Sequence, residues 1–179
     1  MYASQRMLVL PAQAIQPGDD LGWASDATNH RTLLASLDST LATEVRARGL
    51  APQWATSGEL DRIARRNPVH VTRPSDIRAG AAVLMLERDR DEDIPEPVAS
   101  QLRVLAGFHE ARYALVPAVV RFERGEFADA GRAVARVGIL DVRGSKLVFI
   151  GDIVGPDAGD ATTALTNLGR RFADLIVPR

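Results

Sequence analysis

The side chains that most resemble catalytic groups are four acids in one short stretch. They are Asp89, Asp91, Glu92 and Asp93. General acid–base catalysis needs paired carboxylates with shifted pKa values, but these acids alternate with arginines and lie beside prolines. A calcium loop is not matched, because glycine and a closing glutamate are missing at the required positions. We therefore predict that residues 88–96 form an exposed loop, with a weak cation site as the alternative.

Other sequence patterns of catalysis and cofactor binding do not occur. The histidines, at positions 30, 70 and 109, are too scattered for a zinc motif, and no HExxH spacing exists. GxxxxGK, GxGxxG and GxSxG are absent, so neither a nucleotide cofactor nor a hydrolase nucleophile is indicated. The chain has no cysteine, which excludes thiol catalysis and thiolate metal sites. We predict a protein that is not an enzyme, with no catalytic, cofactor-binding or metal-binding residues.

One alternative to this prediction is an enzyme whose catalytic residues meet only in the folded chain. Its sign would be a deep pocket with convergent polar groups and perturbed pKa values. A pocket that holds Asp141, Asp152 and a pair of arginines would favour this alternative.

The one basic cluster consists of Arg62, Arg65 and Arg66, and Arg46 and Arg48 could lie near it in the fold. No aromatic side chains that could stack on bases are interleaved with these arginines, which disfavours nucleic-acid binding. The chain has 22 Lys and Arg against 23 Asp and Glu, so its net charge of -1 gives no overall attraction to nucleic acid. We keep the cluster as a candidate basic surface and expect no nucleic-acid partner.

The length of 179 residues suits one domain with a hydrophobic core and is too short to predict two. No window approaches the roughly 18 apolar residues that a membrane span requires, and the first residues lack the pattern of a secretory signal. We expect residues 1–179 to form a single soluble domain. A signal or lipid anchor of a longer natural product would lie outside this sequence.

The longest strand-like sequence lies in the second half of the chain. Alternating apolar residues and turn signals predict strands at 112–123, 131–141 and 146–154. The even-numbered residues from Ala114 to Phe122 are predicted to share one face. Both faces are largely apolar, so the sheet requires helices on two sides.

Two local features shape this predicted antiparallel sheet. Residues 141–146 form a hairpin turn, in which Gly144 is free to adopt a positive φ angle. Pro117 has no amide hydrogen, so its strand is predicted to lie at an edge or to bulge there.

Helical spacing of apolar residues predicts four helices. They cover residues 30–48, 57–66, a segment that begins at Pro97 and includes His109, and a segment from Asp160 to the end of the chain. Thr28 or Asn29 is the expected N-cap of the first helix, and Thr56 with Glu59 forms a capping box for the second.

The remaining segments are shorter. Residues 6–11 are predicted to form the first strand and residues 69–72 a brief strand, and Trp23 is predicted to pack. Residues 81–86 fit a strand or a helix equally. The predicted fold is therefore an α/β domain with a mixed sheet of about four or five strands and helices packed against it.

Several of these segments also carry family-like motifs. A helix that ends at 106–112 leads into the strand segment 113–117, and a later strand ends in Leu-Asp-Val before the turn glycine at 144. The strand that ends at 151–155 precedes the final amphipathic helix, and at the other end of the chain Leu8 to Pro11 belong to the first predicted strand. In this order the motifs resemble the CsgG and TolB amino-terminal-domain group of bacterial envelope proteins. Residues 50–95 depart from the group, and the lipidated cysteine of its lipoprotein members is missing.

The resemblance implies a non-enzymatic accessory protein of secretion, assembly or envelope maintenance. Such a protein would be periplasmic, or attached to a membrane through a segment outside this sequence. It would bind another envelope protein, or associate with itself, through an edge strand. The alternative is a soluble cytoplasmic α/β domain that binds a small molecule or, weakly, nucleic acid.

Overall fold

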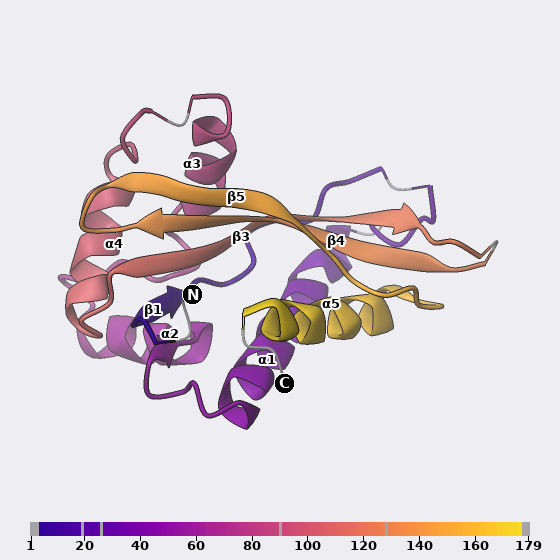
Figure 1. The fold of residues 1–179 in the computed structure, drawn as a ribbon, viewed down its shortest axis with the longest axis horizontal. Helices are drawn as coiled ribbons and strands as arrows, with labels where there is room; N and C mark the ends of the chain where they lie inside the picture. Colours follow the sequence, from indigo (N-terminus) through magenta and orange to yellow (C-terminus); the bar gives the residue numbers. More distant parts are fainter. Residues whose placement is uncertain (1–3, 19, 26, 90, 128, 177–179) are drawn as a thin grey trace.

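The computed structural model describes residues 4–176 except 19, 26, 90 and 128. Its centre is a mixed five-stranded sheet in the order β2-β1-β3-β4-β5, with helices packed against it (Figure 1). The strands are β1 (Met7–Val9), β2 (Trp54–Ala55), β3 (Tyr113–Arg124), β4 (Gly131–Asp141) and β5 (Lys146–Val154). The helices are α1 (Ala27–Ala47), α2 (Ser57–Arg66), α3 (Ala79–Leu86), α4 (Val98–Gly107) and α5 (Ala161–Ile176). The predicted α/β class with a mixed sheet is confirmed.

The sheet has a parallel part and an antiparallel part. β1 pairs in parallel with both β2 and β3, whereas β3, β4 and β5 form an antiparallel meander. The limits predicted for β4 and β5 are confirmed, and β3 is displaced by one residue at each end. Strong alternation and short turns explain this agreement, because both signals are local.

A bulge in β3 reverses the faces of its side chains. The register shifts between Pro117 and Val119, which confirms the predicted bulge. Ala118 therefore packs in the core beside α3, whereas Val120 packs in the core beside α1 and α5. The prediction that Ala114 to Phe122 share one face is wrong, because one extra residue exchanges the two faces of a strand.

The helices cover the two faces of the sheet unequally. On one face, α1 and α5 bury apolar residues along the length of β3 and β4, including Leu115, Phe122 and Ala133. On the other face, α2, α3 and α4 bury the sheet only as far as Ala118 on β3 and Leu140 on β4. The second face is therefore closed at one end only.

Three predicted helices are confirmed with small changes. α1 begins at Ala27, so Thr28 and Asn29 lie in its first turn and the predicted cap is wrong. α2 has the predicted limits, and the Glu59 carboxylate accepts a hydrogen bond from the Thr56 amide at 3.3 Å. The Asp160 carboxylate caps α5 by accepting the Thr163 amide at 2.9 Å.

The shorter segments show where local sequence was insufficient. Residues 81–86, which fitted either state, belong to helix α3. His109 lies beyond the end of α4 and contacts the Gln53 carbonyl oxygen at 3.0 Å. Trp23 packs against Phe122 with ring centroids 5.5 Å apart, as predicted.

Two further predictions are wrong. Residues 69–72 form no strand, because the Val71 amide bonds to the Asn67 carbonyl at 2.9 Å in a turn that follows α2. In the hairpin turn it is Ser145, with φ 52°, that adopts the left-handed conformation predicted for Gly144. The Asp141 carboxylate accepts the Arg143 and Gly144 amides at 3.0 and 2.9 Å, which fixes the turn before Ser145.

Candidate functional site

The outer edge of β5 is the longest open edge of the sheet. At its start, the loop before α4 covers this edge, because Asp93 forms an antiparallel bridge with Lys146. The Ile94 amide donates to the Ser145 carbonyl at 2.8 Å, and Lys146 Nζ lies 3.0 Å from the Asp93 carboxylate. The predicted loop at 88–96 is therefore confirmed for its described residues, but it is anchored at Ile94, which is buried.

Beyond this cover, the main chain of β5 faces outward without a partner strand. The Gly155 amide donates to the Ala133 carbonyl on the β4 side at 2.9 Å. Because main-chain groups alternate in direction along a strand, those of Ile150, Asp152 and Val154 point away from β4. Among the described residues, no strand or bridge pairs with this side of β5 after Lys146. The open stretch 149–154 is about 20 Å long.

Apolar side chains accompany this open edge. Phe149 and Val154 are 48% and 43% exposed, and Val148 is similarly exposed. The Phe149 ring lies across Gly151, where an added Cβ would come within 2.7 Å of the ring. Natural edge strands are usually protected by charges, prolines or bulges. Here a bulge opposite Ile139 and Leu140 protects only the beginning of β5.

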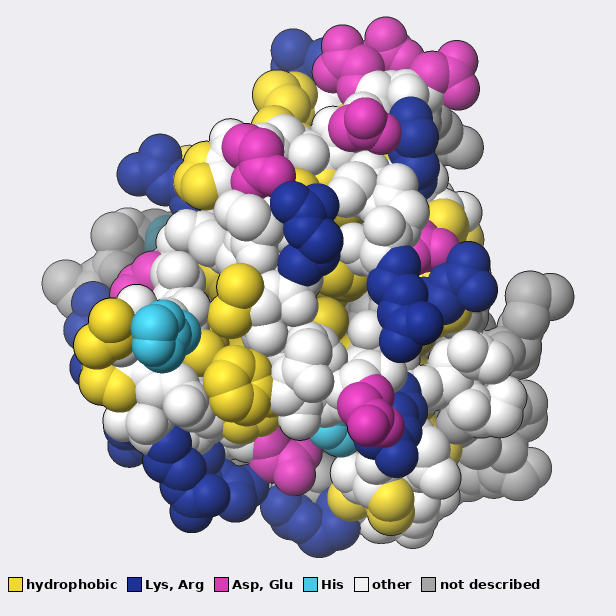
Figure 2. Space-filling model, turned by 90° about the vertical axis from the view of Figure 1, so that its left-hand side faces the viewer, with side chains coloured by type: hydrophobic (Ala, Val, Ile, Leu, Met, Phe, Trp, Pro, Cys, Tyr) yellow, Lys and Arg dark blue, Asp and Glu magenta, His cyan; other side chains and the backbone are white. Residues whose placement is uncertain are grey.

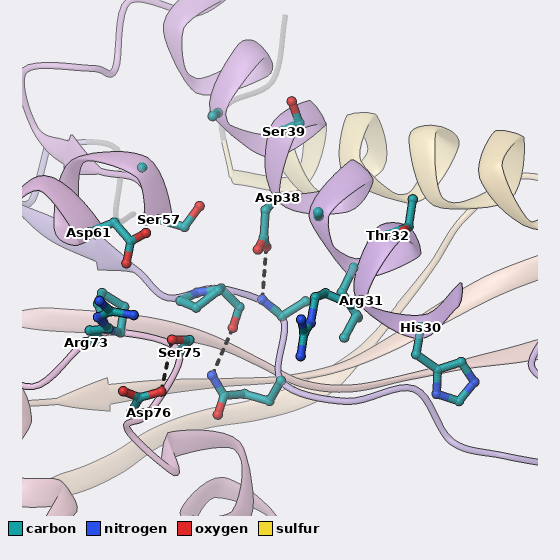
Figure 3. Close-up of a pocket in the computed structure, with 18 residues that line it drawn as sticks. His30, Arg31, Thr32, Asp38, Ser39, Ser57, Asp61, Arg73, Ser75 and Asp76 are labelled. Carbon is teal, nitrogen blue, oxygen red and sulfur yellow. Dashed lines mark hydrogen bonds between the residues drawn. The ribbon is translucent and has the colours of Figure 1, made fainter. Parts of the chain in front are cut away.

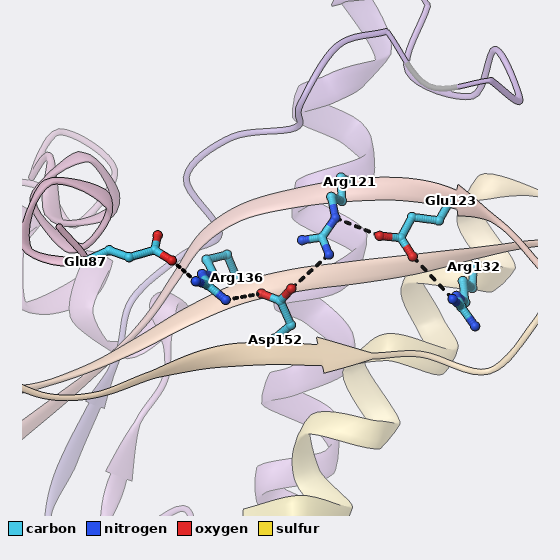
Figure 4. A network of polar contacts seen from close by, with 6 residues as sticks. All are labelled: Glu87, Arg121, Glu123, Arg132, Arg136 and Asp152. Carbon is cyan, nitrogen blue, oxygen red and sulfur yellow. Dashed lines mark hydrogen bonds and ion pairs between the residues drawn. The ribbon is translucent and has the colours of Figure 1, made fainter.

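A charged network covers the half of the sheet that α3 and α4 leave open. It consists of Glu87, Arg121, Glu123, Arg132, Arg136 and Asp152 (Figure 4). Arg121 and Arg136 each donate to Asp152 at 2.8 Å. Partial burial disfavours the charged form of Asp152, but these hydrogen bonds outweigh it and hold its pKa below the ordinary value. The network neutralises itself and carries no free catalytic carboxylate.

Asp141 and Asp152, which would share one pocket in the alternative of an enzyme, lie apart on the sheet. Asp141 pairs with Arg112 at 2.8 Å, whereas Asp152 lies opposite Arg136 on β4. Arg136 and Asp141 are about 17 Å apart along the strand. Asp152 does meet a pair of arginines, Arg121 and Arg136, as the alternative required. Asp141 lies apart from these three residues.

The candidate basic surface lies on α2, where Arg62, Arg65 and Arg66 are exposed. Arg65 pairs with Asp61 at 3.8 Å, and Arg62 shares a small pocket of about 320 Å³ with Arg46. Arg48 instead forms ion pairs with Glu44 of α1 and Asp174 of α5. Figure 2 shows dark blue and magenta side chains intermixed over this end of the molecule, so the positive charge is not continuous there.

The histidines lie in separate places. The His30 ring contacts the Ala24 carbonyl oxygen at 3.0 Å, and His70 is exposed in the turn after α2. Within the described residues, no three His, Asp or Glu side chains are grouped closely enough to hold a metal ion. No described helix has both the length and the hydropathy to cross a bilayer.

Sequence reasoning did not single out Phe149 or the open end of β5. The available signal was the apolar run from Leu147 to Ile150 in the last strand of a meander, because a last strand has a free edge when nothing follows it in the sheet. The position of β5 in the sheet order was needed to use this signal.

No protein-family model and no curated protein matches the chain. Among solved structures, it is similar to lipoprotein GNA1162 from Neisseria meningitidis, with 15% identity and a TM-score of 0.42 over 96% of this chain and 95% of that chain. It is also similar to the LpoB C-terminal domain from Salmonella enterica, with 13% identity and a TM-score of 0.40 over 85% of this chain and 82% of that one. Likenesses of this strength carry no inference about function, which must come from the residues themselves.

Proposed function

We propose that this protein is a non-enzymatic accessory protein of the bacterial envelope, which binds an extended segment of another envelope protein along the open edge of β5. The observation that carries the proposal is the unpaired stretch 149–154, with exposed apolar side chains at Phe149 and Val154. In strand addition, main-chain hydrogen bonds supply affinity and alternate side chains supply specificity. β5 offers both elements.

The envelope location is supported by the resemblance of the chain's motifs to those of the CsgG and TolB amino-terminal-domain group. The proposal includes a periplasmic or membrane-attached location of the full-length protein. Cell fractionation tests it, with recovery in the periplasm or membranes as the expected result. Recovery in the cytosol alone would contradict the envelope location and leave the binding edge to be tested by itself.

The partner strand is tested by site-specific cross-linking. The chain has no cysteine, so Val154→Cys introduces a single thiol at the open edge. Val69→Cys is the matched control, because Val69 is 85% exposed in a turn outside the sheet. We expect a cross-linked envelope protein with the thiol at 154 and none with the thiol at 69. Equal cross-linking from both positions would contradict the proposal.

A second variant tests main-chain pairing directly. Val154→Pro removes an outward-facing amide without removing a hydrogen bond to β4. We expect it to abolish cross-linking from a thiol placed at Phe149, while the thermal unfolding midpoint changes little. Cross-linking of the chain to a second copy, together with a dimer mass in solution, would identify self-association as the use of this edge.

A further inference from the structure

A groove lies where two parallel strands end, away from β5. β1 leads into α1 on one face of the sheet, and β2 leads into α2 on the other face. In α/β proteins, ligands bind at such a point, because the chain leaves adjacent strands in opposite directions and opens a crevice at their carboxyl ends. The groove here has a volume of about 1310 Å³, and residues 11–13 lie on its floor.

Asp38 of α1 points into this groove (Figure 3). Its carboxylate accepts a hydrogen bond from the Ala12 amide at 2.9 Å, and no described Arg, Lys or His lies within ion-pair distance. Burial raises the pKa of Asp38 to about 7, although the bond from Ala12 lowers it. The groove thus holds a carboxyl group that lacks a positive partner.

Two arginines on the walls of the groove form no ion pair with any described residue. Arg31 comes from α1 and Arg73 from the loop after α2, and both are exposed. Within the described part of the chain, neither is in ion-pair distance of a carboxylate, whereas the arginines of the sheet network are all paired. Figure 3 shows Asp38 and Arg31 on α1 across from Arg73.

We propose that this groove binds a small zwitterion, a free amino acid or a short peptide with free ends, whose ammonium group pairs with Asp38 and whose carboxylate pairs with Arg31 or Arg73. A ligand with only a negative charge would leave the partly buried carboxylate of Asp38 without a positive partner, which is unfavourable, and a ligand with only a positive charge would leave both arginines without a negative partner. Hydroxyl groups of Ser39, Ser57 and Ser75 also line the groove and suit the amide of a peptide. This site is independent of the β5 edge.

Three probes of one shape test the two charges separately. They are the dipeptide alanyl-alanine, its N-acetyl form and its C-terminal amide, added to the 15N-labelled protein and followed by NMR. We expect alanyl-alanine to shift resonances of residues 11–13 and α1, and each blocked form to bind at least about tenfold more weakly, since a charge-assisted hydrogen bond contributes that much. Equal binding of all three, or no shifts at about 10 mM, would overturn the proposal.

Variants assign the charges to residues. Asp38→Asn keeps an acceptor for the Ala12 amide, so the fold is retained, and it should weaken alanyl-alanine binding at least about tenfold. At least one of the variants Arg31→Gln and Arg73→Gln should weaken binding of the dipeptide but leave binding of its amide form unaffected, and unchanged dipeptide binding by both would contradict the role of the arginines. Arg65→Gln, on α2 outside the groove lining, is the control and should bind as wild type. Unchanged binding by Asp38→Asn, with folding verified by circular dichroism, would refute the assignment.

The pH dependence of binding gives an additional readout. An ammonium ligand favours the ionised form of Asp38, so affinity should rise between about pH 5.5 and pH 7.5, by up to about tenfold per unit below the pKa. The other charged groups that line the groove are His30, Arg31, Asp61, Arg73 and Asp76. Comparison with Asp38→Asn separates the effect of Asp38 from the effects of these groups, because that variant should lose the rise in affinity with pH. A rise of equal size in the variant would contradict the role of Asp38.

Discussion

The two faces of the sheet are closed in different ways. α1 and α5 cover one face along its length with apolar residues, whereas the other face is covered at one end and charged at the other. On the charged half, Arg121 and Arg136 pair with Asp152 in place of a helix. Paired charges tolerate water, so this half of the sheet remains open beside β5, and that is where a partner strand can approach.

Two carboxylates illustrate the difference between the charged face and the face that helices cover. Asp152 on the open face has two arginine partners and a lowered pKa. Asp38, on the helix that covers the other face, accepts a hydrogen bond from the Ala12 amide, pairs with no cation among the described residues and has a raised pKa. Their contributions to stability therefore depend on pH in opposite directions.

The largest effect is expected where α5 closes the sheet. Phe172 and Leu168 are fully buried there. Phe172→Ala should lower the free energy of unfolding by about 3 to 5 kcal/mol and Leu168→Ala by about 2 to 5 kcal/mol, through lost burial and a residual cavity. Urea denaturation measures the change, with the exposed Phe127→Ala as control. A small shift in the urea midpoint would show that α5 is peripheral. The two faces would then differ less in their helical cover than the packing indicates.

The next effect concerns Asp38. Its folded pKa of about 7 lies above the ordinary value of 3.8, so the folded state binds the proton more tightly, and stability is lost as pH rises between these values. Asp38→Asn removes this cost and should stabilise the protein at about pH 8 by on the order of 2 to 4 kcal/mol. Denaturation at about pH 3.5 should show little difference. Equal stability of the two proteins at both pH values would contradict the raised pKa of a buried Asp38 carboxyl.

Gly138 probes the covered end of the second face. A Cβ at this position would lie 2.6 Å from Val83 Cγ2 on α3. Gly138→Ala should lower the free energy of unfolding by about 1 to 3 kcal/mol because of overpacking. If the clash with Val83 is the cause, Gly138→Ala should cost less in a chain that also carries Val83→Ala. Gly58→Ala, with no atom within 4 Å of the added Cβ, is the matched control. An unchanged free energy of unfolding for Gly138→Ala would mean that α3 can move away from the sheet.

A smaller effect is expected for the charged network. Asp152→Asn should cost about 1 kcal/mol, less at high salt, because partly exposed ion pairs are weak and screened. The pKa of Asp152 is lowered in the folded state, so its contribution is present above the ordinary value of 3.8 and is lost as pH falls. Denaturation at two salt concentrations measures it, with exposed Glu92→Gln as control. A loss of stability in Asp152→Asn that does not depend on salt would indicate that Asp152 stabilises the sheet through packing and not through its charge.

The smallest effect belongs to the candidate basic surface on α2. Replacement of Arg62, Arg65 and Arg66 by Gln should change the free energy of unfolding by less than about 0.5 kcal/mol, because these side chains are exposed. We also expect no retention of the wild-type protein on heparin at low salt. Retention that falls steeply with salt and disappears in the variant would establish a nucleic-acid-binding surface.

The sequence by itself determined the elements whose signals are local. Alternation and turns gave the limits of β4 and β5, the capping box of Thr56 and Glu59 gave the start of α2, and Pro117 indicated a bulge. Each signal acts over a few residues, through side-chain period or a missing amide hydrogen. The sequence therefore predicted the class of fold and most of its helices and strands.

Only the tertiary structure decided which surfaces are closed. Strand β2 has two residues and exists because β1 pairs with it, and the apolar segment at 81–86 becomes a helix where it packs on β3. Asp38 lies among the apolar residues of an amphipathic helix, and its lack of a positive partner in the described part of the chain depends on segments far away in sequence. The open edge of β5 likewise depends on the order of strands in the sheet. Long-range contacts set these features, and no local spacing encodes them.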